Sequence, residues 1–266
     1  MQKVIVLTDL HILPKGDRII GLDPAARFGH VMADALRQHP DATHVILTGD
    51  LTHNGTSVEY AHLRALLADC PVPVSLMLGN HDRRAPFIAA FPDSPLTDAG
   101  FVQRLIDLDH ARLILLDTLD EDAPDLHSGY LCPDRLNWLD HALDTAQDQP
   151  CILFTHHPAF VTGFGGMDRI GLRNRAELIK RLHRNGAVVQ IVSGHIHRNV
   201  QGAAGGIPNA VFKSPCHQMP LILGEQSPQL SIDEPGAYGL LLIGPEGVVV
   251  HTQDVGLPTV TPDIYV

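Results

Sequence analysis

Two histidines separated by one residue, His195 and His197, directly follow an apolar run late in the chain. Residues i and i+2 of a strand project to the same face, so two imidazoles at this spacing can converge on one point. Taken alone, the pattern favours two partly exposed histidines in a turn. The other polar residues of the chain decide between this interpretation and a site at which both imidazole nitrogens act as ligands.

The first eighty residues alternate between strand and helix patterns. Short β-branched or apolar runs predict strands at 4–7, 44–47 and 73–78, and helical spacing of apolar residues predicts helices at 24–38 and 57–67. Ser57 is the expected N-terminal cap of the second helix. This order is a βαβαβ unit with a parallel sheet, which places the chain in the α/β class.

The remaining elements continue this pattern and then change. We predict strands at 111–117, 151–155 and 188–192, and helices at 132–146 and 174–184, the latter stopped by Asn185-Gly186. Apolar runs at 210–212 and 240–243 alternate with Gly and Pro, as in antiparallel strands. The Gly- and Pro-rich stretches at 161–171 and 202–208 are expected to be loops.

Polar residues follow five of the predicted strands at the point where each strand ends. In open α/β sheets, ligands bind beyond the carboxyl ends of the strands, so these side chains should share one rim. They are Asp9 with His11, Asp50, Asn80 with His81, His156, and His195 with His197.

This set of side chains indicates a metal centre. It offers two carboxylates, one amide oxygen and four or five imidazoles, which suit Zn, Mn, Fe or Co rather than Ca or Cu(I). The ligands are too many for a single ion. Two ions that share one bridging carboxylate would use them all.

The charge of the chain limits its partners. It carries 30 acidic against 19 basic residues, a formal net charge of −11. This balance disfavours binding to nucleic acid polymers or anionic membranes. If the substrate is a phosphate ester, bound metal cations would reverse the local field.

The cysteines and the N-terminus point to a cytoplasmic protein. The four cysteines are widely separated, which is neither a zinc ribbon nor a disulfide framework, and isolated thiols suit a reducing compartment. The first apolar run is broken by Asp9, too early for a signal peptide. No stretch approaches the roughly 20 apolar residues of a membrane span.

The strand-end motifs together resemble those of the calcineurin-like metallophosphoesterases. The chain has DLH at 9–11, GDLTHNG at 49–55, GNHD at 79–82, THHP at 155–158 and GHIH at 194–197, in the family's order. It is most similar to the bacterial class III cyclic-nucleotide and glycerophosphodiester phosphodiesterases. The similarity to that branch includes the stretch from His156 to Asp168 and the later His217-Gln218 before an apolar, proline-containing segment.

The resemblance implies a fold and a domain organisation. The fold would be a four-layer αββα sandwich with two mixed sheets flanked by helices. Residues 1–200 would form the catalytic core. Residues 201–266 would be β-rich, complete the second sheet and contribute a cap or subunit contact. A homo-oligomer, dimer or higher, is expected.

The resemblance also implies a role for each site residue. Asp9, His11 and His197 would hold one ion, and Asn80, His156 and His195 a second. Asp50 would bridge the two ions, which are divalent or mixed-valence Mn, Fe, Zn or Co. His81 would face the substrate phosphate as the catalytic residue without binding metal, and His217 would contact the substrate.

The implied reaction is hydrolysis of a small phosphodiester by a metal-bound hydroxide. Glycerophosphodiesters rank slightly ahead of cyclic nucleotides, on His217 alone. Two alternatives remain. One is a phosphomonoesterase or protein phosphatase on the same site, although a monoester dianion usually needs an extra arginine clamp. The other is a non-catalytic scaffold, which would be expected to lack a ligand, and here none is missing.

The sequence allows two interpretations for several residues near the motifs. His157 is expected to support the strand end rather than bind metal, and His53 either lines the pocket or has a plain loop role. Asp82 either orients His81 or caps the following turn. The remaining residues are Arg83 and Arg84, which either touch phosphate or are solvated, and Met167 and Asp168, which match the family without an evident physical role.

Overall fold

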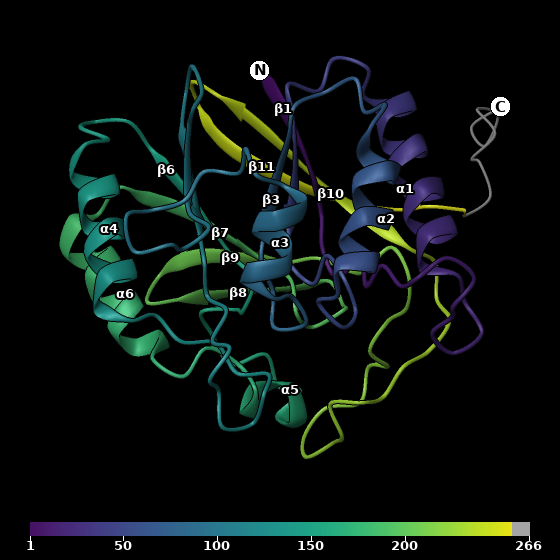
Figure 1. Ribbon diagram of the computed structural model, residues 1–266. Helices are drawn as coiled ribbons and strands as arrows, with labels where there is room; N and C mark the ends of the chain where they lie inside the picture. The colour runs from purple at the N-terminus through teal and green to yellow at the C-terminus, as the bar shows by residue number, and fades with distance from the viewer. Residues whose placement is uncertain (257–266) are drawn as a thin grey trace, which may run out of the picture.

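Two β-sheets lie face to face between two layers of helices in the computed structural model, which describes residues 1–256 (Figure 1). The first sheet has the spatial order β11 (Gly247–Asp254), β10 (Ala237–Gly244), β1 (Gln2–Leu7), β2 (His44–Thr48) and β3 (Val74–Met77). The second has the order β4 (Arg104–Asp107), β5 (Arg112–Leu116), β6 (Cys151–Thr155), β7 (Val188–Ser193), β9 (Ile207–Val211) and β8 (Val200–Ala204).

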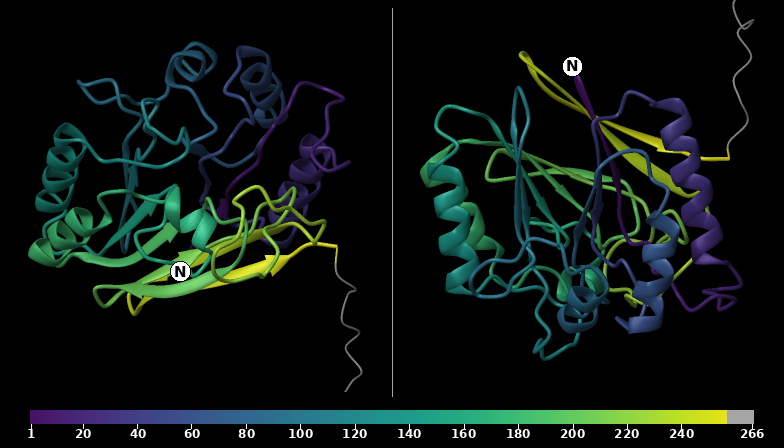
Figure 2. Two further views of the ribbon diagram at one scale, coloured as in Figure 1. Left: turned by 90° about the horizontal axis from the view of Figure 1, so that it is seen from below. Right: turned by 45° about the horizontal axis from the view of Figure 1, so that its top comes forward.

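The helices cover the outer faces of the sheets. Helices α1 (Pro24–Gln38), α2 (Ser57–Leu67) and α3 (Arg84–Ala90) pack on the first sheet, and α4 (Pro133–Asp144) and α6 (Arg175–Asn185) pack on the second. The two groups lie on opposite sides of the molecule (Figure 2). A short helix, α5 (Gly165–Arg169), lies beyond the strand ends (Figure 1). The predicted four-layer αββα sandwich is confirmed.

The continuous apolar run of β1 reflects burial of both of its faces. Ile5 and Leu7 belong to the core beneath α1 and α2, whereas Val4 and Val6 belong to the core between the two sheets. Strands covered on both faces read as unbroken apolar runs. The predicted βαβαβ unit is confirmed, since β1 pairs parallel to β2 and β2 pairs parallel to β3.

Local signals set the helix ends. Asp23 caps α1 by accepting from the main-chain nitrogen of Ala26 at 3.0 Å. Thr56 and Glu59 form a capping box at the start of α2, so the cap is Thr56 and not the predicted Ser57. Gly186 ends α6 with a φ of 80°, in the left-handed region that favours glycine.

Two predicted loops were wrong in part. The stretch 202–208 forms most of the β8–β9 hairpin, and 161–171 contains α5. Helix α3 and strand β4 were not predicted at all. Strand β8 reads VQGAA and has no apolar β-branched run, so its extended form depends on the ladder to β9, a tertiary contact that local propensity does not contain.

The C-terminal segment contributes strands to both sheets. The predicted boundary at residue 200 falls at the start of β8; β8 and β9 extend the second sheet, and β10 and β11 extend the first. Residues 257–266 of the predicted segment lie outside the described residues. Among residues 1–256, no helix has both the length and the apolar character needed to cross a bilayer.

The strands that carry the candidate ligands come from both sheets. β1, β2 and β3 run parallel in the first sheet, and β6 and β7 run parallel in the second. Their carboxyl ends meet on the same side of the sandwich, close to α5 (Figure 1). The rim expected of one sheet is therefore shared by two.

Candidate metal centre

The seven predicted metal ligands meet beyond the carboxyl ends of five strands. All seven are buried, including both histidines of the His-x-His pair, which excludes the exposed-turn interpretation. They are Asp9 and His11 after β1, Asp50 after β2, Asn80 after β3, His156 after β6, and His195 and His197 after β7.

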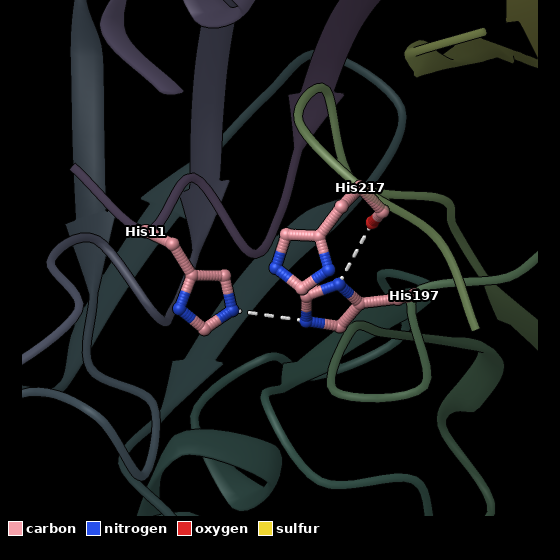
Figure 3. Close-up of side chains that lie close together, drawn as sticks. All are labelled: His11, His197 and His217. Atoms are coloured by element: carbon pink, nitrogen blue, oxygen red, sulfur yellow. Dashed lines mark hydrogen bonds between the residues drawn. The ribbon is translucent and has the colours of Figure 1, made fainter. Parts of the chain in front are cut away.

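One group of these side chains forms around His11 and His197. Their Nε2 atoms lie 2.9 Å apart (Figure 3). Oδ2 of Asp50 lies 3.6 Å from Nε2 of His11, and Oδ1 of Asp9 lies 3.6 Å from Nε2 of His197. All four residues offer a ligand atom within 4.8 Å of the others. Two imidazoles and two carboxylates at this spacing fit a divalent transition metal.

A second group forms around the side-chain oxygen of Asn80. This oxygen lies 3.1 Å from Nε2 of His156 and 2.9 Å from Nδ1 of His195. Nε2 of His156 is also 3.5 Å from Oδ1 of Asp50. One oxygen of Asp50 therefore faces each group, as a bridging carboxylate requires.

Main-chain carbonyls orient two of the histidines. Nδ1 of His156 donates to the carbonyl oxygen of Thr48 over 3.0 Å, and Nδ1 of His197 donates to that of His217 over 2.9 Å (Figure 3). A proton on Nδ1 leaves the lone pair on Nε2 and points it into the group. This arrangement is typical of metal-ligating histidines.

Five of the seven residues have left-handed backbones. The φ angles are 46° for Asp50, between 48° and 55° for Asp9, His11 and His197, and 72° for His195. Such angles cost about 1–2 kcal/mol for a residue other than glycine, and strain of this kind clusters at functional sites. Main-chain hydrogen bonds hold it in place, from the nitrogen of Asp9 to Gly49 and from that of His11 to Asp50.

Gly49 is required by both conformation and space. Its φ is 105°, and a Cβ there would lie 2.5 Å from Nδ1 of His156. A side chain at this position would displace the imidazole from Asn80 and Asp50. Packing of the site therefore requires a glycine directly before Asp50 at the end of β2.

Burial and neighbouring charges act differently on the histidine ligands: the pKa of His156 is raised to about 9, because Asp50 and Asp9 outweigh the effect of burial, whereas burial disfavours the charged form of two others. It lowers the pKa of His11 and of His195 well below the ordinary value, helped by neighbouring imidazoles. For Asp50, burial acts to raise the pKa, but His156, His81 and His11 together hold the pKa well below its usual range. Neutral imidazoles and an ionised carboxylate are the protonation states that bind metal, so metal binding would release a proton from His156.

His81 and His217 flank the first group. The main-chain nitrogen of His81 donates to Oδ1 of Asp50 over 2.8 Å, and its Nδ1 donates to the carbonyl oxygen of His53 over 2.7 Å, so its Nε2 remains for other partners. His217 is buried, and its Nε2 has no hydrogen-bond partner among the described residues. Burial lowers the pKa of His217 to about 2.

Both ring nitrogens of His157 are occupied by the protein. Its Nδ1 lies 2.8 Å from the hydroxyl of Thr118, and its Nε2 donates to the carbonyl oxygen of His127 over 2.9 Å. Burial lowers the pKa of His157 to about 3, so the ring is neutral. The geometry agrees with the expected supporting role.

Asp82 has a larger role than either sequence interpretation gave it. Its buried carboxylate accepts from the main-chain nitrogens of Leu51, Thr52 and Gly79 and from the hydroxyl of Tyr60, at 2.9 to 3.2 Å. It therefore joins the loops after β2 and β3, which carry the bridging Asp50 and Asn80.

His127 was missed by the sequence analysis. It lies in the loop after β5, and its Nδ1 accepts from the amide nitrogen of Asn80 over 3.0 Å. No motif surrounds it, and no ligand motif was found after the predicted strand 111–117, which precedes it.

The nearby arginines do not reach the site. Arg84 pairs with Asp117 and Glu121, and Arg198 pairs with Glu234. Arg83 donates to the main-chain oxygens of Asn80 and Asp82. None of the three lines the cavity described next.

A cavity of 430 Å³ opens over the two groups. Its floor contains His11, Asp50, Asn80, His195 and His197, with the non-ligand histidines around them. Among the described residues no lysine or arginine lines it. The rest of the lining, here called the apolar wall, is largely apolar and contains Ile19, Ile20, Met167, Ile170, Met219, Pro228 and Leu230.

Met167 and Asp168 now have physical roles. Met167 belongs to the apolar wall. The carboxylate of Asp168 accepts from the nitrogen and hydroxyl of Thr162 at 2.8 Å and from the nitrogen of Gly163 at 2.9 Å, which fixes the loop that carries α5.

Solved structures with the same fold include two phosphatases, one of them described as a dimetal enzyme. The chain matches a dimetal phosphatase from Danio rerio with a TM-score of 0.71 and 15% identity, over 95% of this chain and 96% of that one. It matches a purple acid phosphatase from yellow lupin with a TM-score of 0.68 and 14% identity, over 95% and 51%. At these identities the likeness shows the fold.

Sequence comparison gives the family. The chain is 40% identical to a probable cyclic nucleotide phosphodiesterase of Rhodopseudomonas palustris over 94% of this chain and 91% of that protein. It is 30% identical to the 3',5'-cyclic adenosine monophosphate phosphodiesterase CpdA of Pseudomonas aeruginosa over 81% and 76%, and 27% identical to the glycerophosphodiester phosphodiesterase GpdQ of Enterobacter lignolyticus over 91% and 87%. The family model for calcineurin-like phosphoesterases matches residues 2–199. The chain therefore belongs to the calcineurin-like phosphoesterase family.

Proposed function

We propose that the protein hydrolyses a small phosphodiester with two transition metal ions, Mn, Fe, Zn or Co, held by the seven ligands. The arrangement of Asp50 carries this proposal, since one of its oxygens lies 3.6 Å from Nε2 of His11 and the other 3.5 Å from Nε2 of His156. When bound, such ions acidify a water molecule and clamp the phosphoryl oxygens during in-line attack.

The chain's own groups would act on the substrate from two sides. His81 directs its Nδ1 proton to the carbonyl oxygen of His53, so its Nε2 is the nitrogen that meets a ligand in the cavity. In its doubly protonated form, His81 would donate the Nε2 proton in a hydrogen bond to a phosphoryl oxygen or transfer it to the departing alkoxide. His217, with its buried and unpartnered Nε2, would contact the substrate next to His197.

The cavity lining supports a diester over a monoester. A diester carries one negative charge, which two cations can neutralise. A monoester dianion is usually held by an additional arginine fork, and Arg83, Arg84 and Arg198 are all engaged elsewhere. A monoesterase or protein phosphatase remains the alternative, and a scaffold is disfavoured because every ligand is present.

Among diesters, the apolar wall favours a cyclic nucleotide. A nucleobase is flat and largely apolar on its faces, and Met167, Met219 and Leu230 offer a matching surface. A choline-like cation would need an aromatic cage or a carboxylate. Among the described residues, the lining has no Phe, Tyr or Trp, and its one carboxylate, Asp50, is assigned to the metal ions. His217 lies beside the first group, with its ring centroid 5.4 Å from that of His11. We therefore expect it to contact the phosphate of the substrate and to discriminate little between the alcohols esterified to that phosphate.

Hydrolysis rates test this proposal. Protein loaded with Mn²⁺, Co²⁺ or Zn²⁺ is assayed with 3',5'-cyclic AMP, glycerophosphocholine, bis-para-nitrophenyl phosphate and para-nitrophenyl phosphate, with Asp50→Ala as the control for contaminating enzymes. We expect cyclic AMP to exceed glycerophosphocholine and the bis-ester to exceed the monoester. Faster cleavage of the monoester overturns the diester assignment, and faster cleavage of glycerophosphocholine overturns the substrate preference.

The homo-oligomer stays a prediction. Leu221, Ile222 and Leu223 are consecutive and exposed, and apolar surface of this kind is typical of a subunit contact. Light scattering of the purified protein gives the mass directly, and a monomer at micromolar concentration would contradict the prediction.

A further inference from the structure

The predicted histidine ligands differ in what holds their second ring nitrogen. His156 and His197 direct Nδ1 to main-chain carbonyls. His11 instead directs its Nδ1 to Nδ1 of His53, over 3.3 Å. His53 is not in the ligand set and has no role in the proposed reaction.

The protonation pattern of this pair follows from the use of His11 as a ligand. Nε2 of His11 lies 2.9 Å from Nε2 of His197 and faces the first group, so as a ligand it must offer a lone pair. The ring proton of His11 then lies on Nδ1 and must be donated outward. Nδ1 of His53 is placed to accept it, which puts the proton of His53 on Nε2.

The ring of His53 is held independently of His11. Its main-chain nitrogen donates to the carbonyl oxygen of Ile12 over 3.1 Å, which extends the bridge between Ile12 and Thr52. Its ring stacks on that of His81, with centroids 5.1 Å apart and planes inclined by 25°. Because His53 is half-buried and fixed at both its main chain and its ring, it can fix the direction of His11.

We propose that His53 is a positioning residue for the first metal ion: its Nδ1 accepts the Nδ1 proton of His11 and so directs Nε2 of His11 toward Asp50 and His197. The inference rests on the two-ion site proposed above. Outer hydrogen-bond partners of this kind contribute about 10- to 100-fold to metal affinity.

The nitrogens of His11, His53 and His81 also lie within 4.8 Å of one another, which is the spacing of a third ion site. Because Nε2 of His11 faces the first group, His11 could offer this cluster only Nδ1, whose proton is donated to Nδ1 of His53. We therefore assign the cluster to hydrogen bonding, and a metal stoichiometry above two would overturn this assignment.

The test measures metal affinity and does not depend on turnover. Mn²⁺ is titrated by calorimetry into chelator-stripped protein that carries Asn80→Ala. This substitution removes a ligand of the second site, so that the tight binding measured is that of the first site. His53→Ala, His53→Asn and His53→Gln are added to this background. The oxygen of Asn lies two bonds from Cβ, as Nδ1 of His does, whereas the Gln amide lies three bonds away, as Nε2 does.

We expect His53→Ala and His53→Gln to weaken Mn²⁺ binding about 10- to 100-fold, and His53→Asn to restore affinity close to that of the Asn80→Ala parent. His127→Ala in the same background is the matched control, because its partner Asn80 has already been removed, and it should change nothing. Circular dichroism establishes that each variant is folded.

Equal losses for His53→Asn and His53→Ala would show that packing of the ring, not the acceptor, matters, and no loss in any variant would also overturn the inference. If the Asn80→Ala parent binds no Mn²⁺ at all, the two-ion site itself is wrong. The failure of the inference is therefore distinct from the failure of the proposed function.

Discussion

The amide nitrogen of Asn80 donates to Nδ1 of His127 over 3.0 Å, and this contact turns the amide oxygen toward His156 and His195. An amide that is free to rotate presents oxygen to a cation only part of the time. We predict that His127→Ala in the otherwise unaltered protein weakens the second ion about 10- to 100-fold. Two-site Mn²⁺ titration measures this. An equal loss at both sites would contradict a local effect on Asn80.

His81 is expected to act on the leaving group. His81→Ala should retain both ions, because His11, His156, His195 and His197 already supply the imidazole ligands of the two groups. It should lose about 10²- to 10⁴-fold in rate on a cyclic nucleotide, whose alkoxide needs a proton, and much less on bis-para-nitrophenyl phosphate. Similar losses on both substrates would indicate charge stabilisation instead, and loss of metal would make His81 a ligand.

Asp82 is expected to hold the two loops of the site together. Asp82→Ala leaves the buried donors of Leu51, Thr52, Gly79 and Tyr60 without their acceptor. At about 1–3 kcal/mol for each of these four unsatisfied groups, the free energy of unfolding should fall by at least about 4 kcal/mol. Urea unfolding measures this, with Tyr60→Phe as a smaller perturbation. A loss below that of Tyr60→Phe would be inconsistent with the assigned role.

The free energy of unfolding should fall in acid, and part of this loss should arise at His44, which lies far from the metal centre. Its Nε2 lies 2.9 Å from the hydroxyl of Ser75, and burial, aided by Arg104, lowers its pKa to about 4. Because the unfolded state binds the proton more readily, this contribution is complete above about pH 6.5 and is lost as the pH falls toward 4.

His44→Gln keeps a hydrogen-bonding group near Nε2 and removes the titration. Between pH 6.5 and 4, its free energy of unfolding should fall less steeply than that of the unaltered protein, by up to about 1.4 kcal/mol per pH unit. Parallel curves from urea unfolding of the chelator-treated proteins would disprove this. The other buried histidines are common to both proteins and cancel in the comparison.

The sequence was sufficient to predict that the candidate ligands lie together, because each follows the end of a buried strand. An apolar run such as 44–47 predicts a strand, and a polar residue just after it must lie at the sheet rim. The sequence could not predict that β1 to β3 and β6 to β7 belong to different sheets, because pairing is decided by contacts distant in the chain. It also contains no direct sign of the left-handed backbone at Asp9 or His195.

The residues around the ligands were harder to predict. His127 and the wall formed by Met219 and Leu230 come from segments without regular structure, where periodicity gives no direction for a side chain. The role of Asp82 required knowing that the loops after β2 and β3 touch. Such contacts depend on tertiary structure, and a single sequence carries little record of them.

The metal stoichiometry tests the central claim most directly. Chelator-stripped protein titrated with Mn²⁺ should bind two ions per chain, about 3.5 Å apart, with the exchange-coupled electron paramagnetic resonance spectrum of a bridged pair. Asp50→Ala should lose that coupling and bind at most one ion tightly. Saturation at one ion per chain, with Asp50→Ala binding as well as the unaltered protein, would contradict the account.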